Sequence, residues 1–224
     1  MSEQVPVITI DGPSGSGKGT VTQGVAERLG WRVLDSGALY RLVGYAVDQI
    51  GVCFDNDNRI SKIASELDVE FKDGQIFLEG KEVTNLIRTE TAGNSASKVA
   101  TMPGVRAALL DWQRDYAQLP GLVADGRDMG TTGFPQAGVT IVLSARAAER
   151  AQRRPKQLTE KGLPANLGAL RAESDWRDVR DRSRAASPLV AAPDAIQIDS
   201  TAMRIDEVVN IVLQRAHEVF ATPL

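Results

Sequence analysis

A glycine-rich segment that contains one lysine is the part of this sequence whose residue types and spacing best support a chemical function. Glycines let a backbone curl so that successive N–H groups point at one anion, and a helix that begins there adds the positive end of its dipole. Lys18 adds a full positive charge that can reach the β- and γ-phosphates of a nucleoside triphosphate, which makes it a candidate catalytic residue. The segment follows the apolar run 5–10 and predicts a phosphate-binding loop made of Gly12, Pro13, Ser14, Gly15, Ser16, Gly17, Lys18, Gly19 and Thr20.

The end of this loop departs from the common pattern in which serine or threonine directly follows the lysine. Here Gly19 follows Lys18, and the hydroxyl comes one residue later, at Thr20. A Gly-Lys-Gly-Thr ending is similar to that of the nucleoside monophosphate kinases, although it does not by itself identify the acceptor. The alternative is a glycine-rich turn between a strand and a helix that holds no ligand.

A second segment, 122–130, alternates acid, base and acid around two glycines. Asp125 ends an apolar stretch, where a carboxylate can help to organise hydrated Mg²⁺, and Arg127 and Asp128 follow it. Packing alone does not require such an alternation, although a purely structural role is the alternative. We expect no direct protein ligand to the metal, and contacts through water from Thr20 and Asp125.

Two further segments carry groups that suit an anionic ligand. Ser36 and Arg41 follow the apolar stretch 32–34, so that an anion at the start of the next helix would meet both; the alternative is a helix cap and a solvated charge. The run 177–184 places Arg177, Asp181 and Arg184 on one helical face. Its alternative interpretation is an exposed helix with weak ion pairs.

The elements that must position these groups alternate between apolar runs and helical patterns. We expect strands near 5–10, 32–34, 122–124, 139–143 and 195–198, each followed by helical sequence. Such alternation predicts an α/β fold with a doubly wound, five-stranded parallel sheet and helices on both faces. Ligands of such sheets lie beyond the carboxyl ends of the strands, where each of the first three segments falls.

Two stretches interrupt the alternation. Residues 66–84 contain short apolar runs separated by Asp-Gly and Glu-Gly, which predicts a small antiparallel sheet. Residues 150–182 are rich in arginine, contain two prolines and suit a mobile lid. In its closed form we expect ATP phosphates to be contacted from among Arg150, Arg153 and Arg154, without the sequence saying which. We therefore predict one domain over 1–224, with its core at about 1–58, 100–149 and 183–224, an insert at about 59–99 and the lid at about 150–182.

Composition restricts the class of protein. One cysteine, Cys53, and one histidine, His217, provide neither an internal disulfide nor a Cys/His zinc cluster nor a Ser-His-Asp triad. No apolar stretch approaches the roughly 18 residues of a membrane span, and no signal pattern begins the chain, so we expect a cytoplasmic protein without a membrane partner. The net charge of −3 argues against a nucleic-acid partner, whereas 11 Lys and Arg against 6 Asp and Glu in 146–184 indicate a local anionic ligand.

In combination and in order, four motifs resemble those of the bacterial cytidylate kinases: GPSGSGKGT at 12–20, LDSGALYR at 34–41, DGRDMGT at 125–131 and RDVRDRSRAASPL at 177–189. The small inserted sheet also resembles the enlarged monophosphate-binding segment of these enzymes. The resemblance implies that the monophosphate and the transferring phosphoryl group are held by Ser36, Arg41, Arg127 and Arg184. It implies that the pentose is held by Arg177 and Asp181, and that the base pocket is lined by Ser97, Arg106 and Asp128.

The resemblance further implies transfer of the ATP γ-phosphoryl group to CMP and dCMP with Mg²⁺, by a monomeric enzyme of pyrimidine nucleotide metabolism. Cytosine presents an amino donor beside two acceptors, which a carboxylate and an arginine would recognise, whereas uracil inverts two of these three groups. The alternatives are another kinase of this type, acting on uridylate, adenylate or shikimate, a GTP-dependent switch, and a nucleic-acid-binding module. No Asn/Thr-Lys-x-Asp guanine motif supports the switch.

Overall fold

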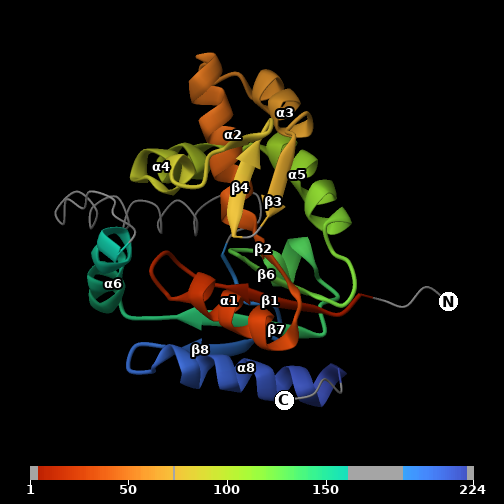
Figure 1. Cartoon of the computed structure of the whole chain (residues 1–224), viewed down its shortest axis with the longest axis vertical. Coiled ribbons are helices and arrows are strands. Elements are labelled where there is room, and N and C mark those ends of the chain that lie inside the picture. The colour runs from red at the N-terminus through yellow and green to blue at the C-terminus, as the bar shows by residue number, and fades with distance from the viewer. Residues whose placement is uncertain (1–4, 73, 161–188, 221–224) are drawn as a thin grey trace. The chain divides into compact units, whose positions relative to one another are not determined.

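A computed structural model describes residues 5–72, 74–160 and 189–220 of the chain (Figure 1). The described residues form two compact units. The first contains the residues up to Ser36 and those from Gln113 onward, and the second contains Gly37–Trp112. The expected insert at 59–99 lies inside the second unit, whereas most of the expected lid lies outside the described residues.

A five-stranded parallel sheet forms the centre of the first unit. Its strand order is β2-β6-β1-β7-β8, and each neighbouring pair is parallel. Every residue of the central strand β1 is buried, as expected for a parallel strand between covered faces. The sheet confirms the predicted fold class, and its strands are β1 (Val7–Asp11), β2 (Arg32–Asp35), β6 (Leu122–Gly126), β7 (Val139–Ser144) and β8 (Ile196–Asp199).

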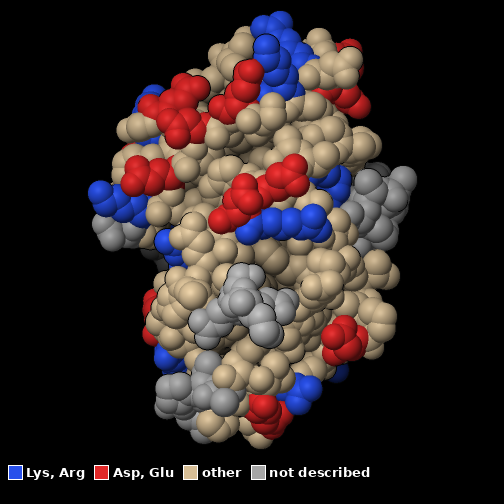
Figure 2. Space-filling view, turned by 90° about the vertical axis from the view of Figure 1, so that its right-hand side faces the viewer, with Lys and Arg blue, Asp and Glu red and all other residues tan. Residues whose placement is uncertain are grey.

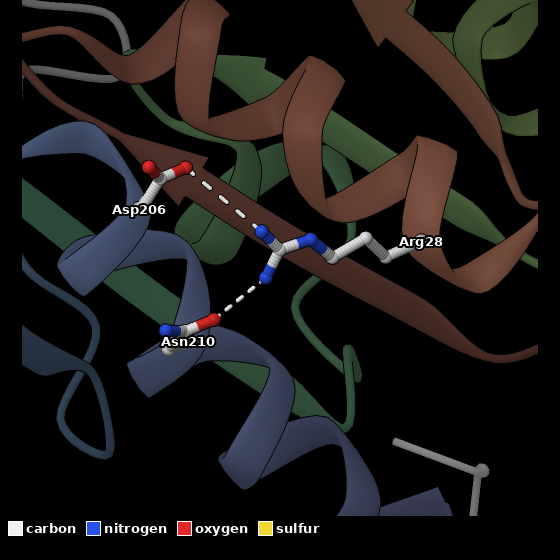
Figure 3. Close-up of polar contacts among 3 residues, drawn as sticks. All are labelled: Arg28, Asp206 and Asn210. Carbon is white, nitrogen blue, oxygen red and sulfur yellow. Dashed lines mark hydrogen bonds and ion pairs between the residues drawn. The ribbon is translucent and has the colours of Figure 1, made fainter.

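Helices α1 (Lys18–Leu29) and α8 (Ile205–Phe220) pack against one face of this sheet (Figure 1). Their apolar residues recur every three or four positions and meet alternate residues of the strands, which is how a helix and a strand each bury one face. The two helices are also joined at their exposed edge, where Arg28 Nη1 donates to Asn210 Oδ1 at 2.6 Å and Nη2 lies 3.8 Å from Asp206 Oδ1 (Figure 3). The shared core includes Ile8, Ile10, Val21, Val25, Ile141, Leu143, Val209 and Val212.

The order of the strands determines where along the sheet a ligand-binding crevice can form. The chain leaves β1 through α1 toward β2, and it leaves the adjacent strand β7 through α6 (Ala147–Glu160) in the direction of β8. Neighbouring strands whose continuations diverge leave a crevice at their carboxyl ends, where α/β proteins bind ligands. The glycine-rich loop 12–17 lies at this point.

The second unit contains helices and the small sheet that the sequence predicts. Its strands β3 (Val69–Lys72), β4 (Gln75–Leu78) and β5 (Lys81–Glu82) are antiparallel. The turn between β4 and β5 has Glu79 and Gly80 in the left-handed region, with φ of 51° and 74°, as short hairpin turns require. The helices that accompany this sheet are α2 (Ser36–Ile50), α3 (Asp57–Ser65), α4 (Glu90–Val99) and α5 (Pro103–Asp115).

The surface and the helix lengths add two observations. Figure 2 shows basic and acidic side chains interspersed over the face that it draws, separated by uncharged residues. Among the described residues, no helix has the length and apolar character needed to cross a membrane.

Candidate active site

The predicted phosphate-binding loop connects β1 directly to the first turn of α1. Gly15 and Gly17 have φ of 75° and 91°, in the left-handed region that side chains disfavour, and α1 begins at Lys18. The carbonyl of Gly17 accepts the first helical bond, from Val21 N at 3.1 Å. The loop therefore ends at the amino end of a helix, whose first N–H groups have no partner within the helix and suit an anion.

The carbonyl oxygens of this loop are held by residues that follow β7 and β8. Arg150 is buried on α6, and its Nη1 donates to Ser14 O at 2.9 Å. Ser200, just after β8, places its hydroxyl 3.1 Å from Ser16 O, and Arg153 Nη1 donates to that hydroxyl at 3.1 Å. The loop is thus supported through its carbonyls by side chains of α6 and of the segment after β8.

The sequence did not indicate that Arg150 and Ser200 contact the loop. The sequence analysis grouped Arg150 and Arg153 with the lid arginines as expected phosphate contacts. In the structure Arg150 Nη1 donates to Ser14 O, and Arg153 Nη2 donates to Ser200 O at 2.7 Å, while the expected contacts with phosphates stay predictions. The spacing of arginines in a run does not predict which of them will bond to a loop more than 100 residues away in the sequence.

Three carboxylates lie at the carboxyl ends of the adjacent strands β2, β6 and β1. Asp35 of β2 is the register partner of Asp125 of β6, and Asp11 ends β1 beside Gly126. Burial, with the neighbouring charge of Asp35, raises the pKa of Asp125 to about 7, although Lys18 and Arg127 lower it. Asp125 is therefore close to half ionised at neutral pH, and a cation placed beside it would favour the ionised form.

Gly19 keeps space open in front of Asp125. A Cβ atom at position 19 would lie 3.4 Å from Asp125 Oδ2, so a longer side chain there would occupy the space beside the carboxylate. Thr20 follows on the exposed side of the first turn. Among the described residues, no group of three or more His, Cys, Asp and Glu side chains is arranged to hold a metal ion by itself.

We expect the substitution Asp125→Asn to stabilise the ligand-free protein more at pH 8 than at pH 5. The pKa of Asp125 is raised from 3.8 to about 7, so its contribution to stability is complete below pH 4 and is lost as the pH rises through 7. Asparagine does not ionise and avoids this loss. Thermal unfolding in EDTA at both pH values measures the effect, and an equal difference in Tm between variant and wild type at the two pH values would contradict it.

Arg127 lies against the phosphate loop, as the two motifs suggested. Its Nη1 donates to Gly12 O at 2.6 Å, so the acid-base-acid segment and the glycine-rich loop meet at the sheet edge. Asp128 is 3% exposed and immediately precedes the short π-helix η2 (Met129–Gly133). Its carbonyl accepts from Thr132 N at 2.8 Å and from Gly133 N at 3.1 Å, which fixes the backbone next to the carboxylate.

Ser36 ends the part of the first unit that leads into α2. It is 3% exposed and directly follows Asp35, at the carboxyl end of β2. The structure therefore places Ser36 at the same edge of the sheet as Lys18, Arg127 and Asp128, all within the first unit.

The second unit contains Arg41, Ser97 and Arg106. Arg41 Nη1 donates to Ile87 O at 2.8 Å and to Thr89 O at 3.2 Å, so that this arginine supports the backbone between β5 and α4. Arg106 lies 5.8 Å from the centre of the Tyr40 ring. The buried hydroxyl of Ser97 has no hydrogen-bond partner among the described residues, as expected of a group that a ligand satisfies.

The remaining predicted site residues, Arg177, Asp181 and Arg184, lie outside the described residues. The same holds for most of the expected lid, of which 150–160 belongs to α6.

The family model and the individual relatives that match this chain point to the same family. The family described as cytidylate kinase matches residues 8–218. A cytidylate kinase of Serratia proteamaculans is 52% identical over 227 residues, which cover 100% of this chain and 99% of that protein. A cytidylate kinase of Azotobacter vinelandii is 53% identical, covering 95% and 96% of the two chains, and one of Shewanella halifaxensis is 47% identical, covering 100% of both. The chain, with its phosphate loop at the carboxyl edge of a five-stranded parallel sheet, belongs to the cytidylate kinase family.

Proposed function

We propose that this protein transfers the γ-phosphoryl group of ATP to CMP and dCMP, giving ADP and CDP or dCDP. The observation that carries the proposal is the meeting of the Lys18 loop with Arg127 at one sheet edge, where Arg127 Nη1 lies 2.6 Å from Gly12 O. A triphosphate on the loop N–H groups would present its outer phosphate toward a second cation. Family membership supports cytidylate as the acceptor.

The reaction needs charge neutralisation and alignment more than it needs a base. A nucleoside monophosphate has a second phosphate pKa of about 6, so at neutral pH it already offers an anionic oxygen nucleophile. Lys18 would stabilise charge on the β- and γ-phosphates, while Arg127 and Arg184 would hold the transferring group in line. These three residues are the catalytic residues of the proposal, and 12–20 form its ATP site.

Mg²⁺ bound to the ATP phosphates would supply additional charge neutralisation. Asp125 fits such an ion, because it is a buried oxygen donor beside the space at Gly19, and hard cations prefer oxygen ligands. Asp125 and the exposed Thr20 would hold water ligands of the ion rather than bind it directly.

The acceptor would be recognised by the residues that the family resemblance implies. We assign the monophosphate to Ser36, Arg41, Arg127 and Arg184, and the pentose to Arg177 and Asp181. The base would meet Ser97, Arg106 and Asp128. The buried hydroxyl of Ser97, which has no hydrogen-bond partner among the described residues, supports its assignment to a base pocket, since buried polar groups require partners.

Changing Asp128 alters the choice of base rather than the use of ATP. Its carboxylate accepts from the cytosine amino group, whereas the O4 of uracil would face it without a proton. We expect Asp128→Ala to lower the CMP to UMP ratio of kcat/KM by about 5- to 150-fold, which corresponds to about 1–3 kcal/mol. Asp128→Asn can donate to O4 and should favour UMP further, in steady-state assays with both acceptors.

The KM for ATP serves as the internal control for these two variants and should change less than twofold. A loss of equal size on CMP, UMP and AMP would contradict base recognition. It would instead assign Asp128 to the phosphate or the metal.

The experiment that tests the proposed function measures ADP release with ATP and Mg²⁺ against CMP, dCMP, UMP, AMP, GMP and shikimate. Strong turnover with CMP and dCMP alone is the expected result. Preference for another acceptor would retain the kinase chemistry and reject the pocket assignment. Turnover that no acceptor increases would favour a nucleotide-dependent switch.

We also propose that the enzyme is a cytoplasmic monomer with no nucleic-acid or membrane partner. The 1–224 chain would act as one kinase domain, with its insert at 59–99 and its lid at 150–182. Light scattering during size-exclusion chromatography tests the monomer, and a mass near twice the 24.1 kDa of the chain would contradict it.

A further inference from the structure

The last residue of β1 holds the segment that carries Arg127 and Asp128. Asp11 is 1% exposed, and each of its carboxylate oxygens accepts one backbone N–H, from Met129 at 2.9 Å and from Gly130 at 2.8 Å. Both donors belong to the first turn of η2. One side chain thereby determines the position of two consecutive residues that directly follow Asp128.

Two further bonds join the same parts of the chain. Arg127 Nη1 donates to Gly12 O at 2.6 Å, and Gly12 N donates to Gly126 O at 3.3 Å. Residues 11–12, where β1 becomes the phosphate loop, are therefore bonded to 126–130 at four points. Arg127 and Asp128 lie between these points of attachment.

The far end of η2 is held by a cation. Arg114 Nε donates to Gly133 O and its Nη2 to Thr132 O, both at 3.2 Å. A carboxylate at the N–H end of a helical turn and a guanidinium at its carbonyl end complement the dipole of the turn. The segment is thus anchored at both ends by side chains of opposite charge.

The fit around η2 also leaves no room for it to shift toward the sheet. A Cβ atom at Gly130 would lie 2.4 Å from Thr140 Cγ2 and 3.1 Å from Thr9 Oγ1. Burial raises the pKa of the Asp11 carboxyl group to about 6, although the hydrogen bonds from Met129 N and Gly130 N lower it. The ionised carboxylate is therefore maintained in surroundings that disfavour charge. The two hydrogen bonds from backbone N–H groups offset part of the free-energy cost of burying the carboxylate.

We infer that Asp11 is a positioning residue for the acceptor. Through Met129 and Gly130 it fixes Asp128 and Arg127 relative to the phosphate loop, so that the selectivity for the acceptor base depends on a residue that contacts neither substrate. This inference rests on the proposed function, and it adds to that function a determinant of specificity on the ATP side of the site.

The test compares Asp11→Asn with Thr9→Val by steady-state kinetics. Asparagine keeps the shape but offers one acceptor oxygen, and its NH₂ group would face a backbone N–H. Thr9 is a matched control: it is 0% exposed, it lies on the same strand near Gly130, and its hydroxyl has no partner among the described residues. We expect Asp11→Asn to raise the KM for CMP about tenfold, as loss of a hydrogen bond to a charged group does.

The same variant should lower the CMP to UMP ratio of kcat/KM by about fivefold or more, while the KM for ATP changes less than twofold. Thr9→Val should leave all three quantities within twofold of wild type. A purely structural role of Asp11 would lower stability or kcat without changing the ratio. An unchanged ratio, or an equal rise in both KM values, would overturn the inference.

A second variant keeps the test decisive if Asp11→Asn does not fold. Arg114 is exposed, so Arg114→Gln should fold, and releasing the far end of η2 should lower the ratio in the same direction by a smaller factor. An unchanged ratio in this variant would then overturn the inference. If wild type does not use CMP, the proposed function fails separately, and the same comparison is made between its two best acceptors.

Discussion

Replacing Lys18 by methionine should reduce kcat by about a thousandfold or more, because a single cation that stabilises the transition-state charge of phosphoryl transfer contributes about this much in other enzymes. Lys18 begins α1 directly after the glycine-rich loop, and no other lysine lies in the segment 12–20. Methionine keeps the length and the apolar part of the side chain. The initial rate of ADP formation at saturating ATP and CMP measures the effect.

The control for this substitution is Lys62→Met. Lys62 lies on α3, its side chain is 72% exposed, and its ion pair with Glu66 is of the weak i, i+4 type. Circular dichroism and Tm should be close to those of wild type for both variants, so that a lost rate reflects chemistry. Full turnover by the Lys18 variant would reject the assignment of 12–20 as the ATP site.

The substitution Gly12→Ala should disrupt the loop by steric overlap with the sheet. A Cβ atom there would lie 2.2 Å from Leu143 O, a backbone atom of β7 that cannot rotate away. Either the loop or β7 must shift, at a cost of about 1–3 kcal/mol for overpacking. We expect Tm to fall by about 3–10 °C and the KM for ATP to rise at least tenfold, as measured by thermal unfolding and steady-state kinetics.

Gly51→Ala separates this steric effect from the loss of glycine flexibility. Gly51 has φ of 71°, and no atom would lie within 4 Å of an added Cβ atom. That variant should lose about 1 kcal/mol of stability from backbone strain and keep the KM of wild type for ATP. Equal changes in the KM for ATP in both variants would contradict the proposed contact between Gly12 and β7.

Much of the first unit could be predicted from local sequence. Apolar runs, helical periodicity and the glycines of 12–17 identified the five parallel strands and the loop, because strand, turn and helix preferences act within a few residues. The antiparallel turns at Gly74 and Gly80 were equally visible, since both need φ near 75°. Local steric preferences therefore determined which helices and strands form and which strands end beside charged or phosphate-binding residues.

The roles of individual arginines could not be predicted in this way. The contact of Arg41 with an anion stays a prediction, but the sequence did not indicate that its Nη1 donates to the carbonyls of Ile87 and Thr89. Arg150 is one of several arginines in its segment, and it alone among the described residues donates to Ser14 O. A guanidinium group on a long side chain reaches many partners, and sequence spacing does not select among them.

The sequence by itself determined the chemistry of this protein, namely a cation-bearing phosphate loop, an acid-base-acid segment and a parallel sheet whose strand ends carry both. Only the tertiary structure decided how these parts are held in place. Asp11 meets Met129 across 118 residues of chain, and Arg150 meets Ser14 across 136. The order β2-β6-β1-β7-β8 creates both contacts, because strands that are distant in sequence become neighbours only when the sheet forms.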